Sequence, residues 1–292
     1  MQFGICLPNY GDTLDIEGMK KIALLAEELG YDSIWLTDHI LMPRNSGTPY
    51  ENILETITSM AYLSCLTRKI KIGISSLVIA LRNPVIVAKE LATIDLLSNG
   101  RVMLAVATGW NEKEFNFLGS NFHKRGKIVN ESIELMLSLW QGKNSFEGRN
   151  LRIKFQDAVF SPNVKREIEI WIAGNSEFAM KRAIKYGHAW HPNIYPLDFF
   201  KKLVDRYMSL TTKPKPIRGR IGFDISAKEN TYIGSQGERR IQLSQDMNEN
   251  RKIIEKLESM GVDYLVLATN PNGRILVEKQ EEAIKVFASK FL

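Results

Sequence analysis

The sequence predicts an α/β fold, a TIM (β/α)8 barrel with insertions, and three observations support this prediction. Strand-like and helix-like segments alternate almost from end to end and make eight strand-then-helix units. The strand-like segments are near-continuous apolar runs, as expected for a parallel sheet that is buried on both faces. The length of 292 residues suits a barrel of about 250 residues with insertions. We therefore expect one domain over residues 1–292.

Apolar runs locate the predicted strands. The first run, QFGICLP, begins directly after Met1, and the shortest run, GHAWHP, stops at a proline. The predicted strands are 2–8, 31–37, 70–80, 100–107, 168–174, 187–192, 217–227 and 262–268.

Apolar residues at helical spacing locate the helices between these strands. In the first helix they run from Ile16 to Leu29, and Gly30 stands where a helix would end. Pro84 opens the helix that ends at Leu97. The predicted helices are 16–29, 51–67, 84–97, 123–141, 176–186, 197–210, a segment within 238–259 and the segment after 268. We expect loops at 40–49 and 108–121, and insertions at 142–165, 211–216 and 227–237.

The composition and charge of the chain limit which locations and partners we expect. No apolar run is long enough to span a bilayer. Met1 does not lead into a basic segment followed by an apolar one, so we expect no secretion signal and a cytoplasmic location. Cys6 and Cys65 are isolated and are expected to be free thiols. The net charge of +6 comes from scattered lysines, which argues against a nucleic-acid or membrane partner and mildly favours an anionic ligand.

Residues just past the carboxyl ends of the strands should gather at one mouth of the barrel, where TIM barrels place their active sites. These positions hold Pro8, Asn9, Asp38, His39, Ser75, Ser76, Thr108 to Trp110, Gly174 to Ser176, His191, Asp224, Thr269 and Asn270. The Asp38–His39 pair is the most suggestive, because a histidine beside a carboxylate can move a proton near neutral pH. The structural alternative is that Asp38 caps the next segment and His39 makes one hydrogen bond in the core.

The segment WIAGNSEFAMKRA, residues 171–183, reads as a strand, a turn of small residues and a helix. Backbone N–H groups of Gly174, Asn175 and Ser176, at the positive end of that helix, would suit a phosphate. The alternative is that Asn175 or Ser176 serves only as the helix N-cap. The spacings of a Walker A loop and of a GxGxxG dinucleotide motif are both missing.

Neither a metal site nor a nucleophile is evident. His188 and His191 are three residues apart, but a strand ending at Pro192 points them to opposite faces, and we expect no metal. A GxSxG elbow is also missing. A barrel mouth without these groups is expected to take its reactivity from a cofactor.

Several segments together resemble the luciferase-like monooxygenase superfamily, and most closely its branch that uses the deazaflavin coenzyme F420. They stand in family order over nearly the whole chain. They are FGICLPNYG (3–11), GYDSIWLTDHILMP (30–43), IKIGISSLVIALRNPVIVAKELATIDLLSNGR (70–101), ATGWNEKEFNFLG (107–119), WIAGNSEFAMKRAIKYGHAW (171–190) and GVDYLVL (261–267). The resemblance implies a TIM barrel with insertions, an oxidoreductase activity on a small organic substrate, and a homodimer.

The resemblance also implies roles for individual residues. Asp38 and His39 would lie at the reactive face of the cofactor ring, with His39 as acid or base. Residues that match cofactor-binding segments of the family are Asn9, Asp38, Ser75, Ser76, Thr108, Gly109, Trp110, Ala173, Gly174, Asn175 and Ser176. Ser75–Ser76 matches a strand bulge where the family often has a non-proline cis peptide bond. The turn from Ala173 to Ser176 matches the one that holds the cofactor phosphate.

One position departs from the family pattern. In the sugar-phosphate dehydrogenases a Thr-Gly pair is followed by a glutamate, whereas Trp110 follows Thr108 and Gly109 here. This difference argues against a sugar-phosphate reaction and leaves His39 as the main titratable candidate. Glu114 could take the place of that glutamate from the next turn, but at this spacing we expect it to make a hydrogen bond within the loop. For Phe115 we expect packing beneath the loop.

Two alternatives to F420-dependent hydride transfer stay open. The first is a monooxygenase of the same fold that uses FMN. The second is a non-catalytic protein that binds a flavin or deazaflavin, although such a protein would need no titratable pair at the ring face.

Overall fold

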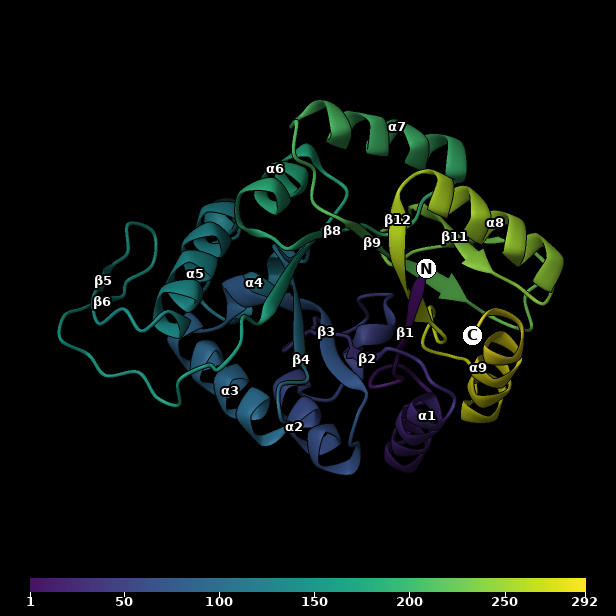
Figure 1. Cartoon of the computed structure of the whole chain (residues 1–292), viewed down its shortest axis with the longest axis horizontal. Coiled ribbons are helices and arrows are strands. Elements are labelled where there is room, and N and C mark those ends of the chain that lie inside the picture. Colours follow the sequence, from purple (N-terminus) through teal and green to yellow (C-terminus); the bar gives the residue numbers. More distant parts are fainter.

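Parallel strands close into a barrel in the computed structural model, which describes residues 1–292. Each strand pairs with the next, and β9 pairs with both β8 and β12, which closes the ring. Figure 1 shows the helices arranged around this ring. The barrel strands are β1 (Gln2–Cys6), β2 (Ser33–Leu36), β3 (Lys71–Val78), β4 (Val102–Ala107), β7 (Glu169–Ala173), β8 (Ala189–His191), β9 (Ile217–Phe223) and β12 (Val262–Ala268).

One long helix follows each barrel strand, so the predicted TIM barrel and its repeating order are confirmed. Local signals set the helix starts: Asp15 caps the first helix, and Asn83 caps the third just before Pro84. The long helices are α1 (Ile16–Glu28), α2 (Thr56–Leu66), α3 (Pro84–Leu97), α5 (Arg125–Trp140), α6 (Glu177–Tyr186), α7 (Leu197–Ser209), α8 (Met247–Ser259) and α9 (Val277–Phe291).

The structure corrects the prediction in the connecting segments. Residues 239–243 form a strand rather than the start of a helix, because β11 (Arg239–Leu243) pairs with β10 (Thr231–Ile233) and with the end of β9. The expected loop 108–121 contains a short helix, α4 (Glu112–Phe117). The helix predicted from residue 51 begins at Thr56, after a 3-10 turn at Pro49–Glu51.

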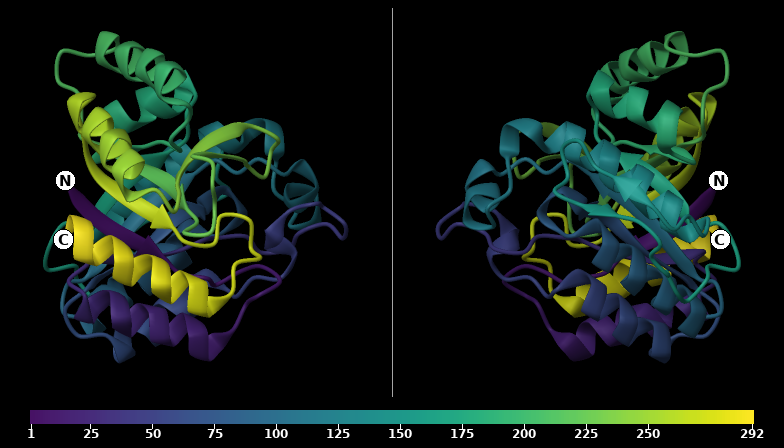
Figure 2. Two further views of the ribbon diagram at one scale, coloured as in Figure 1. Left: turned by 90° about the vertical axis from the view of Figure 1, so that its right-hand side faces the viewer. Right: turned by 90° about the vertical axis from the view of Figure 1, so that its left-hand side faces the viewer.

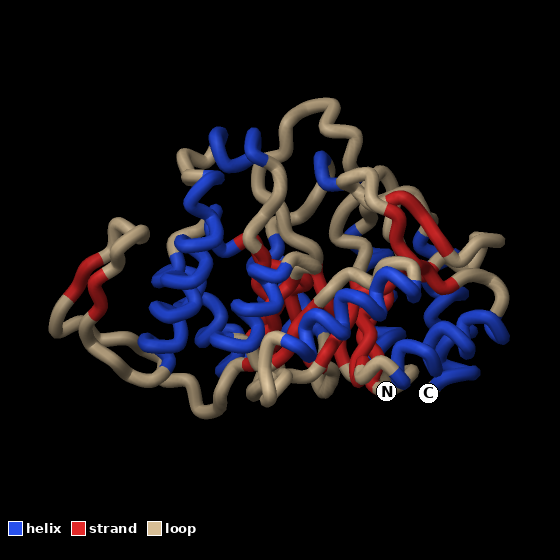
Figure 3. The backbone as a smooth tube through the Cα atoms, turned by 90° about the horizontal axis from the view of Figure 1, so that it is seen from above, coloured by secondary structure: helices blue, strands red, loops and turns tan.

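The insertion 142–165 leaves the body of the barrel. It contains a small antiparallel pair, β5 (Phe146–Glu147) and β6 (Lys154–Phe155), which has no strand partner in the barrel. Figure 3 shows this pair projecting from one side, while the barrel strands lie in the centre among the helices.

The lower part of the barrel lumen is filled with side chains. Inward positions alternate along each strand, so a second apolar cluster forms inside the ring, separate from the larger cluster beneath the helices. The indole of Trp35 lies at its centre, 4.6 Å from the Trp171 ring, and Gly4 and Gly73 on the neighbouring strands leave space for it. The cluster comprises Cys6, Trp35, Met103, Ala105, Trp171, Ala189, Tyr264, Val266 and Ala268.

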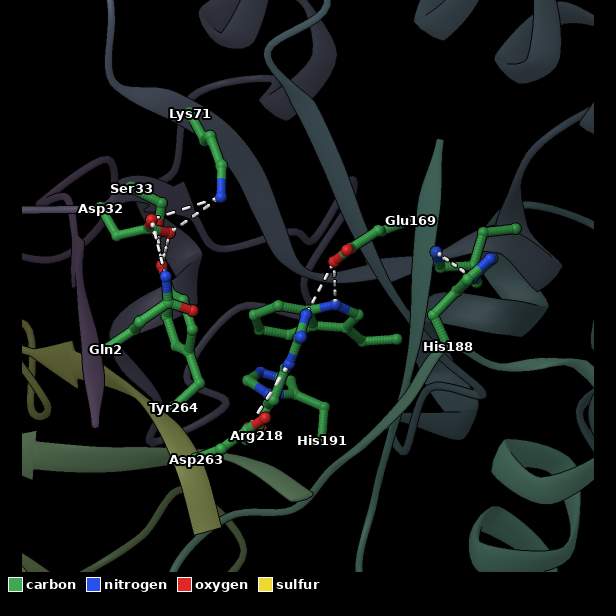
Figure 4. A network of polar contacts seen from close by, with 12 residues as sticks. Gln2, Asp32, Ser33, Lys71, Glu169, His188, His191, Arg218, Asp263 and Tyr264 are labelled. Carbon is green, nitrogen blue, oxygen red and sulfur yellow. Dashed lines mark hydrogen bonds and ion pairs between the residues drawn. The ribbon is translucent and has the colours of Figure 1, made fainter. Parts of the chain in front are cut away.

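Polar groups in this part of the lumen are paired with one another, as Figure 4 shows. The Tyr264 hydroxyl donates to Asp32 at 2.6 Å. Arg218 donates to Glu169 at 2.7 Å and its guanidinium lies 4.9 Å from the Trp171 ring. These contacts satisfy groups that would be costly to bury alone.

The two ends of the barrel differ. Both chain termini lie at one end, and the long loops that follow the strands lie at the other (Figure 2). No helix is both long and apolar enough to cross a membrane. The loop-rich end is the carboxyl end of the strands, where the predicted site residues were expected.

Substitution of Gly73 by alanine should destabilise the barrel. A Cβ at this position would overlap the indole of Trp35, which is fully buried and has no room to move. We expect the free energy of unfolding, measured by urea denaturation, to fall by about 1–3 kcal/mol. Gly126→Ala is the matched control, because a Cβ there lies 3.4 Å from the nearest atom and the site is helical. Equal stability of the two variants would contradict the packing role of Gly73.

A second prediction concerns stability at acid pH. His191 is buried; it donates through Nδ1 to the Arg218 carbonyl and lies 2.8 Å through Nε2 from the Ser75 hydroxyl. Burial lowers the pKa of His191 from 6.5 to about 4, so the imidazole is neutral in the folded protein. When the protein unfolds at acid pH, His191 therefore takes up a proton. Above about pH 6.5 the contribution of His191 to the free energy of unfolding does not change with pH.

As the pH falls from 6.5 to 4, His191 should remove on the order of 3 kcal/mol of stability. Urea denaturation across this range should show a shallower pH dependence for His191→Gln than for the wild-type protein. The exposed His123 gives the control, and His123→Gln should keep the wild-type slope. Identical slopes for all three proteins would show that His191 does not act in this way.

Candidate active site

A cavity of about 380 Å³ opens at the carboxyl end of the barrel. Along each strand every second side chain points into the barrel, so the inward side chains form successive layers. The floor of the cavity is the layer directly above the packed part of the lumen. Where Trp35 and Trp171 fill the lower layer, the next inward residues on the same strands, Thr37 and Ala173, face the cavity. The residues of this upper layer are Thr37, Ser75, Ala107, Ala173, His191 and Arg220.

Most of the residues that the sequence predicted as a site meet at this cavity. The predicted residues that line it are Asp38, His39, Ser75, Ser76, Thr108, Gly109, Trp110, Ala173 and Gly174. Asn9, Asn175 and Ser176 are not among its lining residues. No group of three or more His, Cys, Asp or Glu side chains is arranged to hold a metal ion.

His39 is held by a buried carboxylate. Its Nδ1 lies 2.8 Å from Oε2 of Glu114, and the other oxygen of Glu114 accepts from the Ile40 N–H at 2.7 Å. Burial raises the pKa of Glu114, but the hydrogen bonds from His39, Ile40 and Leu41 outweigh burial and hold this pKa below its ordinary value. An ionised Glu114 requires a proton on Nδ1 of His39, which leaves Nε2 for a ligand.

The role of Glu114 exceeds the sequence prediction. The side chain of Glu114 does not make the expected hydrogen bond within its own loop but reaches His39 and the Ile40 N–H after β2. Helix α4 positions Glu114, and Asn111 caps that helix. Phe115 is fully buried beneath the loop, as expected.

Asp38 is committed to structural contacts. Its carboxylate forms an ion pair with Arg82 at 2.6 Å and accepts from the Val78 N–H at 2.8 Å. The side chain is completely buried. We therefore revise the sequence-based interpretation of Asp38: its contacts anchor the end of β2 and so help to position His39.

The peptide bond between Ser75 and Ser76 is cis, and the β3–β4 register shifts between Ile74 and Leu77. The expected bulge is thus present. The Ser75 carbonyl accepts from Arg220, and its hydroxyl contacts His191. This bond therefore lies in the cavity floor with its polar groups held by two other strands.

The loop after β4 forms one wall. Gly109 has a φ of +76°, and a Cβ there would overlap Phe115 and Val78, so glycine is required. Trp110 meets the His39 ring edge-on at 5.8 Å, and Tyr50 stacks on its face at 4.7 Å. Two aromatic side chains therefore fix the plane of the imidazole.

The turn before α6 shows the N-cap that the sequence offered as an alternative, and the Gly174 N–H, expected to face a phosphate, donates to the His191 carbonyl at 3.2 Å. Ser176 is the N-cap, and its hydroxyl accepts from the Ala179 N–H. The Asn175 side chain makes two hydrogen bonds with the backbone of Asn193. Its amide N–H donates to the Asn193 carbonyl at 2.7 Å, and its oxygen accepts from the Asn193 N–H at 3.0 Å. The backbone N–H groups of Asn175 and Ser176 donate to no group of the chain. They stay available to an anion at the helix N-terminus.

Asn9 has a different place from the one expected. It is fully buried, and its amide donates to the Thr37 carbonyl at 2.8 Å and accepts from the Thr37 N–H at 2.9 Å. Both hydrogen-bonding ends are thus satisfied by the end of β2. This residue ties β1 to the strand that carries His39 rather than facing the cavity.

Sequence reasoning missed several polar residues of the cavity. Arg220 comes from the middle of β9, Arg125 from the start of α5, and Arg240 from the β10–β11 hairpin. A signal for Arg220 was present, because an arginine inside an apolar strand is unusual. The other two depend on loop positions that hydrophobic periodicity does not specify.

Comparison with known proteins places this geometry in context. Residues 1–234 match the family described as luciferase-like monooxygenase. Pyrimidine monooxygenase RutA of Acinetobacter baylyi is 32% identical over 182 residues, 60% of this chain and 47% of that protein. An F420-dependent glucose-6-phosphate dehydrogenase of Amycolatopsis mediterranei is 33% identical over 174 residues, 58% of this chain and 51% of that protein. The chain therefore spans about half the length of the curated relatives it matches.

Solved structures share the fold at low identity. Monooxygenase RslO1 from Streptomyces bottropensis has a TM-score of 0.80 at 16% identity and covers 100% of this chain and 98% of its own. An F420-dependent secondary alcohol dehydrogenase, in complex with an F420-acetone adduct, has a TM-score of 0.77 at 18% identity and covers 97% and 98%.

The oxygenating constituent of 3,6-diketocamphane monooxygenase from Pseudomonas putida, in complex with FMN, has a TM-score of 0.64 at 19% identity and covers 79% of this chain and 68% of its own. With a closed parallel barrel, a cavity at its carboxyl end and a family match over residues 1–234, this chain belongs to the luciferase-like monooxygenase family.

Proposed function

We propose that this protein is an oxidoreductase that transfers a hydride between the deazaflavin coenzyme F420 and a small organic substrate at the barrel mouth. The observation that carries this proposal is the His39–Glu114 pair at the wall of the cavity. A binding site alone has no need of a buried carboxylate that orients an imidazole. The pair therefore supports catalysis over the non-catalytic alternative.

The residues present fit a ring cofactor with a phosphate. The free N–H groups of Asn175 and Ser176 suit the phosphate, and Arg125 lies on the same side of the mouth at the start of α5. The ring would lie over the cavity floor near Ser75 and Ser76. When bound, the cofactor supplies the hydride chemistry, which no side chain of the cavity can perform.

The chain supplies a proton and the exclusion of water. His39, with Nδ1 held by Glu114, can hold or release a proton at Nε2. The loops 40–50 and 108–121 carry Tyr50 and Trp110 over the cavity and would cover the substrate. The presence of Trp110 after Thr108 and Gly109 still disfavours a sugar-phosphate substrate.

An FMN-dependent monooxygenase is the second candidate. The similarity to pyrimidine monooxygenase RutA and the likeness to an FMN-bound oxygenating subunit favour it. The residues around His39 are compatible with a flavin ring and with a deazaflavin ring. Measured affinities for FMN and F420 are therefore needed to decide between the two candidate functions.

Equilibrium binding of F420 and FMN to the apo-protein tests the choice of cofactor. We expect F420 to bind at least about tenfold more tightly than FMN, a difference of about 1.4 kcal/mol. Both dissociation constants can be measured side by side by fluorescence titration. Tighter binding of FMN would favour the monooxygenase, and failure to bind either ring would reject the proposed function.

Substitution of His39 and Glu114 tests the proton-transfer role. We expect His39→Ala to bind cofactor within a few-fold of the wild-type protein but to lower turnover of an electron acceptor by about 100-fold or more. Glu114→Gln should also lower turnover and change its pH profile, because a single amide oxygen cannot serve both His39 and Ile40. His123→Ala, at an exposed site, is the control. Unchanged turnover in His39→Ala would refute the role given to this residue.

A further inference from the structure

Two arginines on β9 point into the lumen but have opposite surroundings. Arg218 and Arg220 are two residues apart on one strand, so both side chains lie on its inner face. Arg218, the lower one, has carboxylates on both sides: Glu169 at 2.7 Å and Asp263 at 3.5 Å. Its charge is therefore compensated within the chain.

Arg220, one layer higher, has no carboxylate partner. Its guanidinium donates to the Ser75 carbonyl, to the Thr37 hydroxyl at 3.0 Å and to the Cys6 sulfur at 3.4 Å. These acceptors fix the guanidinium in place, and none of them is a carboxylate. Because an arginine stays protonated in proteins, a full positive charge lies in the cavity floor.

Other charged groups near the cavity have partners within the chain. Asp38 is paired with Arg82 and Arg240 with Glu238, and the Glu114 carboxylate accepts from His39 and from the Ile40 N–H. The remaining cation is Arg125, which lies at the first turn of α5 and stacks on Phe122 at 3.7 Å. The titratable groups close enough to interact with the charge of Arg220 are Cys6 on β1, Tyr10 after β1, Tyr50 in the 3-10 turn, Tyr232 on β10 and His191 on β8.

None of these neighbours is a carboxylate. Burial raises the pKa values of the Tyr10 and Tyr232 hydroxyls and lowers the pKa of His191 to about 4, so these three groups are neutral near pH 7. A buried cation without a counter-charge is costly, and a negative charge placed beside it recovers part of that cost. A ligand that brings the missing charge would therefore bind more tightly than its neutral form.

We propose that the counter-charge of Arg220 comes from the ligand, so that the cavity binds the deprotonated, anionic form of its ring cofactor in preference to the neutral form. The inference rests on the proposed function, but it holds for either ring. The oxidised flavin ring can lose the proton on N3, and the deazaflavin ring can lose its phenolic proton. In each case the proton goes to solvent and the negative charge stays on the ring system, where the guanidinium of Arg220 would compensate it.

The titration of the bound ring tests this inference without any measurement of turnover. The absorbance of F420 or FMN, bound to excess protein, is followed against pH and compared with that of the free ring. We expect the midpoint for the wild-type complex to lie about one pH unit or more below that of the free ring. This comparison needs no variant, so it stands even if substitutions at Arg220 prevent folding.

Two variants then assign the effect to charge. Arg220→Lys keeps the positive charge and should keep a lowered midpoint, whereas Arg220→Gln removes the charge and should return the midpoint toward that of the free ring. Circular dichroism checks that both variants are folded. A wild-type midpoint at or above that of the free ring overturns the inference, as does an equal midpoint in Arg220→Gln and the wild-type protein. If the wild-type protein binds neither ring, the proposed function fails and this inference fails with it.

Discussion

The packing of Trp35 inside the barrel is the constraint on which the site depends. This indole fills the lumen between Gly4 and Gly73 and closes it from below. The next inward layer, which contains Thr37, Ser75 and Arg220, thereby becomes a floor rather than more core. A close-packed interior leaves few voids, so an open upper layer marks a place built for a ligand.

Electrostatic pairing across distant segments shapes the site above this floor. Asp38 is neutralised by Arg82 from the segment after β3, and His39 is oriented by Glu114 from α4. Each pair joins residues that are far apart in the chain but meet at the carboxyl end of the barrel. The result is a cavity in which an imidazole nitrogen of His39 and the guanidinium groups of Arg220 and Arg125 remain for a ligand to use.

Membership in the luciferase-like monooxygenase family explains the architecture, while the individual chemistry depends on a few side chains. Relatives with F420 and relatives named as monooxygenases share this barrel. A common fold supports different reactions because the loops at the carboxyl end vary independently of the strands. In this chain those loops supply Tyr50, Trp110 and the hairpin that carries Arg240.

Hydrophobic periodicity in the sequence was sufficient to predict the barrel, its strand order and the end at which the site lies, because buried parallel strands and amphipathic helices are local patterns. It also led to His39 and to the turn at Gly174. The sequence alone did not show that β11 would form a strand, that Asn9 would turn away from the cavity, or that Glu114 would meet His39. Those outcomes depend on contacts between segments separated by many residues. Only the folded barrel brings such segments within hydrogen-bonding distance, and only the folded structure shows which charged groups have a partner within the chain.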